Sequence, residues 1–118
     1  MNKRTVGSKK EDEAARFLAQ CGLKVIEQNF RSRFGEIDII ARDGPYTVFV
    51  EVKYRKTASS GHPEEAVSIS KARTISKVAD YYRVIRKLPS DAKIRFDVVA
   101  IEGDQVRWYQ NAFSYTGC

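Results

Sequence analysis

Long hydrophobic runs, closely spaced cysteines and a glycine-rich phosphate loop are all missing from this sequence. No stretch approaches the roughly 18 apolar residues that a membrane helix needs. The basic N-terminus has no apolar segment behind it, so we expect no signal peptide. Cys21 and Cys118 lie too far apart to suggest a zinc site and are too few for a disulfide framework. These absences predict a reduced, cytoplasmic protein with no membrane segment.

The scarcity of histidine argues against catalysis by a nucleophile–histidine–acid triad. The one histidine, His62, precedes a proline in the polar stretch from Tyr54 to Pro63, which we interpret as a mobile loop. A histidine in that setting is typically an exposed loop residue. No nucleophile–histidine–acid set can be assembled around it. Without a glycine-rich loop, an enzyme acting on a small phosphorylated substrate has no specific support either.

Size and charge set the remaining bounds. The chain of 118 residues fits one domain, with residues 1–6 frayed and residues 110–118 as a C-terminal tail. It has 21 Lys and Arg against 15 Asp and Glu, a formal net charge of +6. A small basic domain is attracted to polyanions, of which nucleic acid is the usual one. Solubility alone is the other explanation of this charge.

The stretch from Gly35 to Arg55 predicts a β-hairpin with one charged face. Two runs rich in β-branched residues alternate with charge, and Asp43-Gly44-Pro45 between them is typical of a turn. If residues 43–46 form the loop, Arg42 faces Thr47 and the acids at 38 and 51 face each other. A loop made of residues 43 and 44 alone is the alternative, less favoured because Pro45 cannot donate to a ladder. We expect both registers to keep Asp38, Glu51 and Lys53 on one face.

Two carboxylates facing each other across a hairpin indicate a metal site. They repel unless a cation lies between them, and Mg²⁺ typically takes one or two carboxylates with water and phosphate oxygens. Asp38 and Glu51 are therefore the candidate ligands, with the Val52 carbonyl as a further oxygen. Lys53 would orient the attacking water or offset charge on the phosphate. The alternative is a solvated strand face with an ordinary mixture of charges.

The flanking elements supply further candidates. Ser8 and Glu11 have the spacing of a capping box, which predicts a helix from Ser8 to about Cys21, ended by Gly22. Glu11 shares the buried-facing side of that helix with Leu18. Its position on the buried-facing side has two explanations. Glu11 either belongs to the capping box or is a third acid that reaches toward the hairpin.

A first strand is expected over Leu23–Arg31, near an edge of the sheet. Arg31, at the end of this strand, and Arg33 precede the hairpin and are either ordinary loop charge or phosphate contacts. Glu64 and Glu65 favour a helix start, with a break near Ser68–Ser70 and a longer helix to about Lys87. Its expected apolar stripe consists of Ile75, Val78, Ala79, Tyr82 and Ile85.

A second hairpin is expected over residues 95–101 and 106–109. In it, Asp97 would pair with Arg95 rather than serve as a ligand. The tail carries Phe113 and Tyr115 and would cover the sheet or a partner. The order of helix, strand, hairpin, helix and strands predicts an α/β fold, a mixed central sheet flanked by two main helices.

The motifs also carry a family resemblance. Asp38, Glu51 and Lys53 match the D…(D/E)-x-K signature of the restriction-endonuclease-like superfamily. The ordered set K-E-D-E-A-A-R-F-L, N-F-R, G-E-I-D-I-I-A, V-F-V-E-V-K-Y-R, E-E-A-V and R-F-D-V resembles the YraN-like bacterial family from about Gly7 to Ile101. The core of that family is similar to Holliday junction resolvases.

The resemblance implies a restriction-endonuclease-like core and a Mg²⁺- or Mn²⁺-dependent endonuclease acting on DNA, branched or single-stranded. It implies that Glu11 matches a helix-borne catalytic glutamate and that Lys71 is a second lysine near the phosphate. The alternative for Lys71 is a side chain that extends to solvent. Arg55, at the end of V-E-V-K-Y-R, joins the nucleic-acid contacts. A symmetric homodimer would fit a junction with two equivalent cuts. The alternative is a non-catalytic nucleic-acid-binding protein that retains a nuclease fold.

Overall fold

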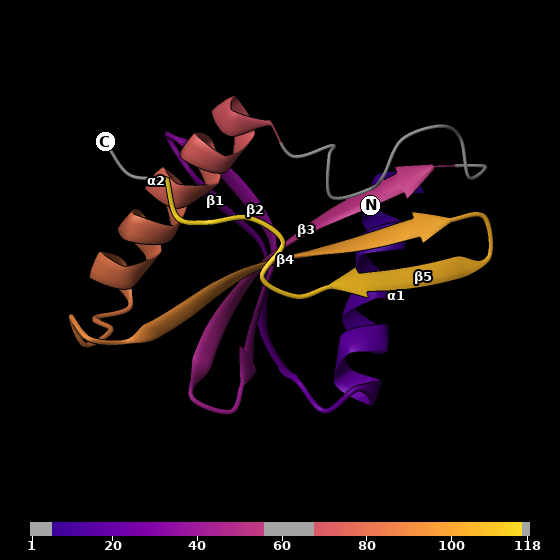
Figure 1. The fold of residues 1–118 in the computed structure, drawn as a ribbon, viewed down its shortest axis with the longest axis horizontal. Helices are drawn as coiled ribbons and strands as arrows, with labels where there is room; N and C mark the ends of the chain where they lie inside the picture. Colours follow the sequence, from indigo (N-terminus) through magenta and orange to yellow (C-terminus); the bar gives the residue numbers. More distant parts are fainter. Residues whose placement is uncertain (1–5, 56–67, 117–118) are drawn as a thin grey trace, which may run out of the picture.

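A five-stranded sheet with one helix on each face makes up the structure (Figure 1). It is a computed structural model that describes residues 6–55 and 68–116. The helices are α1 (Val6–Gln20) and α2 (Ile69–Ile85). The strands are β1 (Lys24–Ser32), β2 (Gly35–Asp43), β3 (Tyr46–Arg55), β4 (Lys93–Glu102) and β5 (Gln105–Tyr109). The predicted order of elements is confirmed.

The strands lie side by side in chain order, from β1 at one edge to β5 at the other. Neighbours are antiparallel except β3 and β4, which are parallel and are connected through α2. A parallel pair needs such a crossover because the chain must return to the starting end of the sheet. The predicted fold class, a mixed sheet flanked by two helices, is confirmed. The arrangement is consistent with a restriction-endonuclease-like core, and β1 is the edge strand that the sequence predicted.

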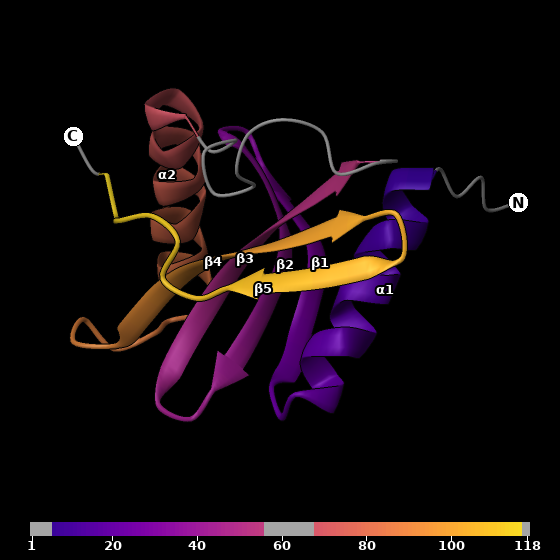
Figure 2. The ribbon, with the colours of Figure 1, turned by 45° about the vertical axis from the view of Figure 1, so that its right-hand side comes forward.

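The two helices cover opposite faces of the sheet (Figure 2). Each face has its own apolar cluster, because alternate strand residues point to opposite sides. The cluster under α1 contains Ala14, Leu18, Ile39, Ala41, Val48 and Val50. The cluster under α2 contains Phe30, Ile40, Phe49, Ile75, Val78 and Phe96. The sheet is therefore buried on both sides, which explains its long β-branched runs.

The β2–β3 hairpin has the register that the sequence favoured. Arg42 faces Thr47, and the pairing continues to Asp43 and Tyr46 next to the turn. The turn is therefore shorter than the predicted loop and consists of Gly44 and Pro45. Gly44 has a φ of 59°, a left-handed conformation that glycine adopts without a Cβ clash. The proline thus lies outside the ladder, as its missing N–H requires.

The side-chain alternation of β2 is interrupted at Asp38. Ile37 and Ile39 are two residues apart and would share a face on a regular strand. Ile37 instead belongs to the cluster under α2 and Ile39 to the cluster under α1. Opposite Asp38 in the β1–β2 register lies Asn29, whose φ of 56° is in the left-handed region. The direction of Asp38 consequently cannot be derived from period-two alternation.

Helix α1 begins earlier than predicted. Val6, expected in a frayed end, is its first residue, and residues 1–5 lie outside the described residues. Ser8 lies inside the helix, so the predicted capping box of Ser8 and Glu11 is wrong. Gly22, with a φ of 100°, follows the helix as expected of a C-terminal glycine.

Helix α2 begins where the sequence suggested a break. Ser68 is its N-cap and accepts a hydrogen bond from the Lys71 N–H at 3.1 Å. The helix start predicted at Glu64 and Glu65 lies outside the described residues, as do His62 and most of the predicted loop. The predicted apolar stripe is buried except for Ile85, which is 40% exposed in the last turn.

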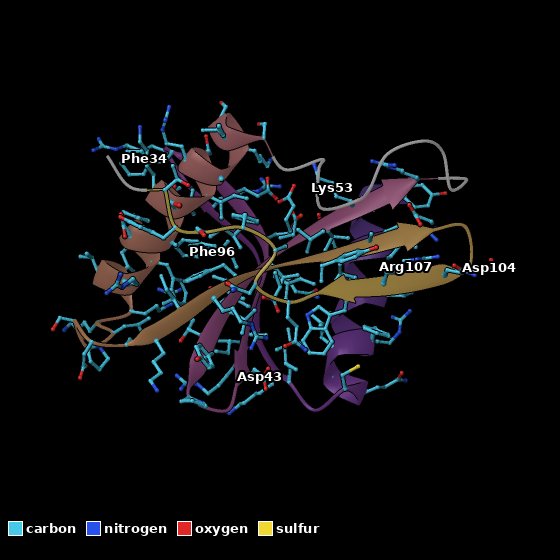
Figure 3. All side chains as sticks on the ribbon, viewed as in Figure 1. Phe34, Asp43, Lys53, Phe96, Asp104 and Arg107 are labelled. Carbon is cyan, nitrogen blue, oxygen red and sulfur yellow. The ribbon has the colours of Figure 1, made fainter. Side chains whose placement is uncertain are left out.

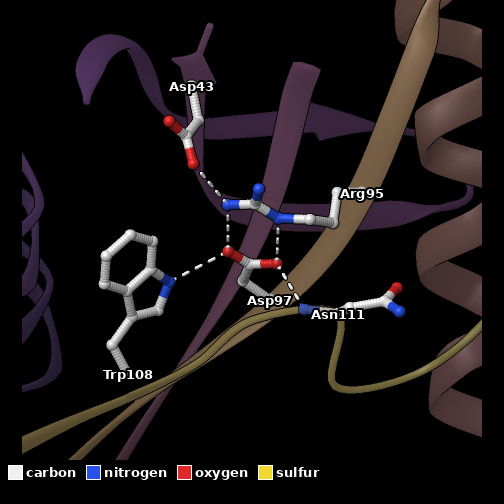
Figure 4. A network of polar contacts seen from close by, with 5 residues as sticks. All are labelled: Asp43, Arg95, Asp97, Trp108 and Asn111. Carbon is white, nitrogen blue, oxygen red and sulfur yellow. Dashed lines mark hydrogen bonds and ion pairs between the residues drawn. The ribbon is translucent and has the colours of Figure 1, made fainter. Parts of the chain in front are cut away.

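A buried polar network fixes β4 against the C-terminal segment (Figure 4). Asp97 is fully buried and accepts two hydrogen bonds from Arg95, one from the Trp108 indole and one from the Asn111 N–H, all at 2.9 Å. Arg95 also contacts Asp43 at 3.0 Å. The predicted pairing of Asp97 with Arg95 is confirmed. A carboxylate with every lone pair directed at a donor is a structural group and leaves no position for a ligand.

The tail covers the α2 side of the sheet, one of the two predicted outcomes. Phe113 stacks on Phe96 with 5.2 Å between ring centroids. The Thr116 N–H donates to Ser76 Oγ at 2.9 Å. Residues 117 and 118 lie outside the described part of the chain.

Neither of the helices in residues 6–55 and 68–116 combines the length and the hydropathy that crossing a bilayer requires.

Candidate metal and nucleic-acid site

Three carboxylates from two elements meet at one end of the sheet. Glu11 comes from α1, and Glu36 and Asp38 come from β2. One carboxylate oxygen of each lies within 4.8 Å of the others. We call these residues the acidic group. Three negative charges at this separation repel one another strongly unless a proton or a cation is shared among them.

Glu11 is directed into this group by the sheet-facing side of α1. It lies one helical turn before Ala14 and Ala15, both of which are buried against the sheet. Its Oε1 atom is buried and has no hydrogen-bond partner among the described residues. A buried carboxylate oxygen without a donor is costly, because the water it lost has not been replaced. Such an atom is typical of a position that an ion or a water molecule fills.

Asp38 lies where the β2–β3 ladder ends. The register runs from the turn to the pair Ile39–Val50, and beyond it Asp38 Oδ2 accepts a hydrogen bond from the Val52 N–H at 2.8 Å. The carboxylate thus takes the place of a ladder carbonyl and is held between the two strands. This hydrogen bond fixes its position and favours its charged form.

The electrostatic surroundings of Asp38 nevertheless favour its protonated form. Burial raises the pKa of Asp38, and the charge of Glu51 raises it further, against the opposing effect of the Val52 hydrogen bond. Glu11 adds to the increase through its charge and a hydrogen bond, and the pKa reaches about 8. A divalent cation would remove this penalty, because it would stabilise the carboxylate form of every member of the acidic group.

Glu51 is held by two lysines on the α2 side of the sheet. It is 7% exposed, and its Oε2 lies 3.4 Å from Lys53 Nζ and 3.6 Å from Lys71 Nζ. The acids at 38 and 51 therefore do not project as a pair from one strand face, because the interruption of β2 turns Asp38 toward Glu11 on α1. They remain close enough for the charge of Glu51 to raise the pKa of Asp38.

The predicted nucleic-acid contacts lie around this end of the molecule. Arg31 is 77% exposed and lies 3.9 Å from Glu36. Arg33 is exposed on the β1–β2 turn, with its guanidinium 5.0 Å from the Phe34 ring centroid. Arg55 is the last residue of β3, two residues beyond Lys53, which Figure 3 labels. Arginines placed beside an acidic group are suited to contact phosphate oxygens once the acids have bound a cation.

The sequence reasoning missed Glu36 as a member of the acidic group. Glu36 lies two residues before Asp38 in the same strand, but the D…(D/E)-x-K signature does not include it. Glu51, Val52 and Lys53 form the neighbouring stretch of β3, where the Val52 N–H contacts Asp38. The candidate residues thus fall into two adjacent sets. Glu11, Glu36 and Asp38 form one, and Glu51 with Lys53 and Lys71 forms the other.

Comparison with known proteins identifies related chains. The model of the uncharacterised protein family UPF0102 matches residues 10–101, close to the range over which the sequence resembles the YraN-like family. A UPF0102 protein of Lachnoclostridium phytofermentans is 46% identical over 117 residues, covering 99% of both chains. One from Shewanella pealeana is 47% identical over 103 residues, covering 87% of this chain and 90% of the relative. One from Fusobacterium nucleatum is 42% identical over 111 residues, covering 94% and 92%.

Proposed function

We propose, from the premise that this chain belongs to the uncharacterised protein family UPF0102, that it is a metal-dependent endonuclease that hydrolyses DNA phosphodiester bonds. The observation that carries the proposal is the acidic group. Its oxygens lie within 4.8 Å of one another, and Glu11 contributes a buried oxygen without a partner among the described residues. Without a cation such a set is unfavourable, because burial and the neighbouring acids raise the pKa of Asp38 despite its hydrogen bond from the Val52 N–H.

The donor set fits Mg²⁺ or Mn²⁺. Every ligand atom is a carboxylate oxygen, and hard oxygen donors without sulfur or imidazole favour these ions. Glu11, Glu36 and Asp38 would hold the cation. Glu51 and the Val52 carbonyl, on the strand adjoining Asp38, remain the further ligands proposed from the sequence. A bound divalent cation supplies a water that is easy to deprotonate and positive charge against the phosphate.

The two lysines at Glu51 have separate roles in this proposal. Lys53 is two residues from Glu51 on the same strand and follows Val52, whose N–H contacts Asp38. It would orient the attacking water and offset the negative charge that develops on the phosphate during attack. Lys71 approaches from α2 and would contact a neighbouring phosphate oxygen, while Arg31, Arg33 and Arg55 hold the strand on either side.

The charge balance supports DNA as the substrate class. A formal net charge of +6 on 118 residues favours a polyanion, and the acidic group is then an exception within a basic surface. Acids collected at one end of a basic protein are expected where a cation mediates contact with phosphate. Branched or single-stranded DNA is the substrate that the sequence resemblance favours.

Cleavage of defined DNA substrates tests the proposal. The protein is incubated with duplex, single-stranded, flap and four-way-junction DNA in Mg²⁺ or Mn²⁺, and the products are resolved on denaturing gels. We expect cleavage that Asp38→Ala, Glu51→Ala and EDTA each abolish, while DNA binding is retained. Asp104→Ala, in the exposed β4–β5 turn, is the matched control and should cleave normally. Cleavage at the wild-type rate in both acid variants would refute the assignment.

The same experiment distinguishes the nuclease from a binding protein without catalytic activity. A non-catalytic nucleic-acid-binding protein would leave all substrates intact in either metal. Its DNA binding would weaken steeply with salt and would not respond to EDTA. That pattern would replace the nuclease proposal with the binding one.

A further inference from the structure

An apolar groove lies on the outer side of α2, next to the β1–β2 turn. It is lined by Phe34, Lys77, Asp80, Tyr81 and Val84 and has a volume of about 370 Å³. We call it the aromatic groove. Figure 3 shows Phe34 beside α2, in the same upper half of the view as Lys53.

The side chains of the groove are unusually exposed for their size. Phe34 is 40% exposed, Tyr81 37% and Val84 76%. The two rings contact each other edge to face, with centroids 6.2 Å apart and planes at 68°. They therefore form two apolar walls at an angle to each other. Exposed apolar patches bordered by polar residues mark interaction sites more often than chance.

The border of the groove is cationic. Arg33 lies over the Phe34 ring, and the exposed Lys77 lines the groove. The acid in the lining, Asp80, is already engaged, because it accepts a hydrogen bond from the Tyr115 hydroxyl and lies 3.9 Å from Arg83. A second hollow of about 450 Å³ shares Asp80 and Val84 with the groove and adds Arg83 and Lys87. Positive charge thus continues along α2 from the groove.

Aromatic rings beside a track of positive charge match the chemistry of unpaired nucleotides. Exposed bases stack on aromatic side chains, while lysines and arginines follow the phosphates. The groove is also correctly placed, since Phe34 precedes Gly35 and Glu36, so one short turn connects it to the acidic group. Arg31, across the same turn, lies 3.9 Å from Glu36.

We propose that the aromatic groove binds an unpaired nucleotide next to the scissile phosphate, so that the substrate is DNA with a single-stranded segment. The proposal rests on the nuclease function and specifies its substrate class. A base stacks on Phe34 or Tyr81, and Arg33 and Lys77 contact the adjoining phosphates. Bases inside a duplex are stacked on each other on both faces and cannot make this contact.

A second copy of the chain fits the groove less well. A symmetric interface places each residue near its own counterpart or a neighbour's. Centred on this groove, it would bring the Arg33 and Lys77 of both copies together. Each copy also has a net charge of +6, so like charges would oppose the contact.

DNA binding in EDTA tests the proposal without cleavage. Fluorescence anisotropy compares a blunt duplex, the same duplex with a single-stranded extension, and the single strand alone. We expect the extended duplex and the single strand to bind more tightly than the blunt duplex. Phe34→Leu and Tyr81→Leu keep apolar bulk but remove the ring, so each should weaken binding of the extension by about 5-fold or more. Binding of the blunt duplex should change by no more than about 2-fold.

Tyr46→Leu is the matched control. Tyr46 is 36% exposed, similar to Tyr81, and lies at the β2–β3 turn, the opposite end of β2 from Phe34. It should leave all three affinities unchanged. A 2-aminopurine base in the extension should change its fluorescence on binding to the wild type but not to Phe34→Leu. Equal affinity of Phe34→Leu and wild type for the extended duplex would overturn the proposal. So would loss of a dimer in Phe34→Leu, by sedimentation, with DNA binding intact.

The outcome is separable from the nuclease test. Cleavage by the wild type in Mg²⁺, without any effect of Phe34→Leu on DNA binding, would refute the groove proposal and support the nuclease proposal. Binding of the extension that depends on the Phe34 and Tyr81 rings, without cleavage in either metal, would support the groove as a binding site and refute the nuclease function.

Discussion

Replacing Asp38 by asparagine should make the metal-free protein more stable, and increasingly so as the pH rises. The substitution removes the charge but keeps an oxygen that can accept from the Val52 N–H. In the folded wild type the pKa of Asp38 is raised from 3.8 to about 8, by burial and by the charge of Glu51. Between these values the folded state holds a proton that the unfolded state has released. The free energy of unfolding of the wild type therefore falls as the pH rises through this window.

The magnitude follows from the width of the window. Each pH unit in this window lowers the free energy of unfolding of the wild type by about 1.4 kcal/mol. Between pH 3.8 and pH 7 the loss of stability is therefore at most about 4 kcal/mol. Asp38 retains partial contact with solvent, which screens the repulsion, so we expect about half of this. At pH 7 in EDTA, the free energy of unfolding of Asp38→Asn should be higher than that of the wild type by about 2 kcal/mol.

Urea unfolding at several pH values measures this difference. The two proteins should have similar stability near pH 4 and diverge up to about pH 8. The control is Asp104→Asn, which removes the same charge in the exposed β4–β5 turn (Figure 3). A stability difference between Asp38→Asn and wild type that is independent of pH, or a slope that Asp104→Asn shares, would refute the reasoning.

Three further substitutions test other parts of the account. Asp97→Ala should lower the free energy of unfolding by about 3–5 kcal/mol in a urea titration, because it leaves the partly buried Arg95 with one partner fewer and the Trp108 and Asn111 N–H groups without acceptors. An effect below about 1 kcal/mol would contradict the network. Gly35→Ala should lower the free energy of unfolding by about 1–3 kcal/mol in the same assay. The φ of 148° disfavours a side chain, and the added Cβ would lie 2.8 Å from the Thr74 methyl. An unchanged unfolding midpoint would argue against this close approach. Lys53→Ala should reduce the rate of DNA cleavage by about 100-fold or more in single-turnover assays while Mn²⁺ binding persists; a rate unchanged at saturating metal would remove Lys53 from the chemistry.

Much of the fold could be predicted because local signals agreed with it. The β2–β3 hairpin was readable from its alternation and from Gly44-Pro45, and the register followed from keeping the proline outside the ladder. Gly22 marked the end of α1, and the break predicted near Ser68–Ser70 coincides with the start of α2. In each case a single residue type is required by backbone geometry, so the sequence carries the information directly.

The site was harder to predict because it depends on an irregularity. Period-two alternation would keep Asp38 and Glu51 on one face, but the break opposite Asn29 turns Asp38 toward α1. A left-handed asparagine inside a strand leaves little trace in a hydrophobic pattern, since asparagine is also common in turns. Glu36 has no place in the D…(D/E)-x-K signature, and its proximity to Glu11 depends on where α1 lies. Contacts between distant elements are set by packing, which local patterns do not encode.

Binding of Mn²⁺ to the acidic group tests the central claim most directly. Calorimetric titration at pH 7, in buffers of different ionisation enthalpy, gives the stoichiometry, the affinity and the number of protons released. We predict a saturable site that releases about one proton, because Asp38 has a pKa of about 8 and must lose its proton to bind a cation. Asp38→Asn and Glu11→Gln should each weaken binding strongly, and Asp104→Asn should not. Absence of saturable binding by the wild type, or equal binding by all four proteins, would contradict the account.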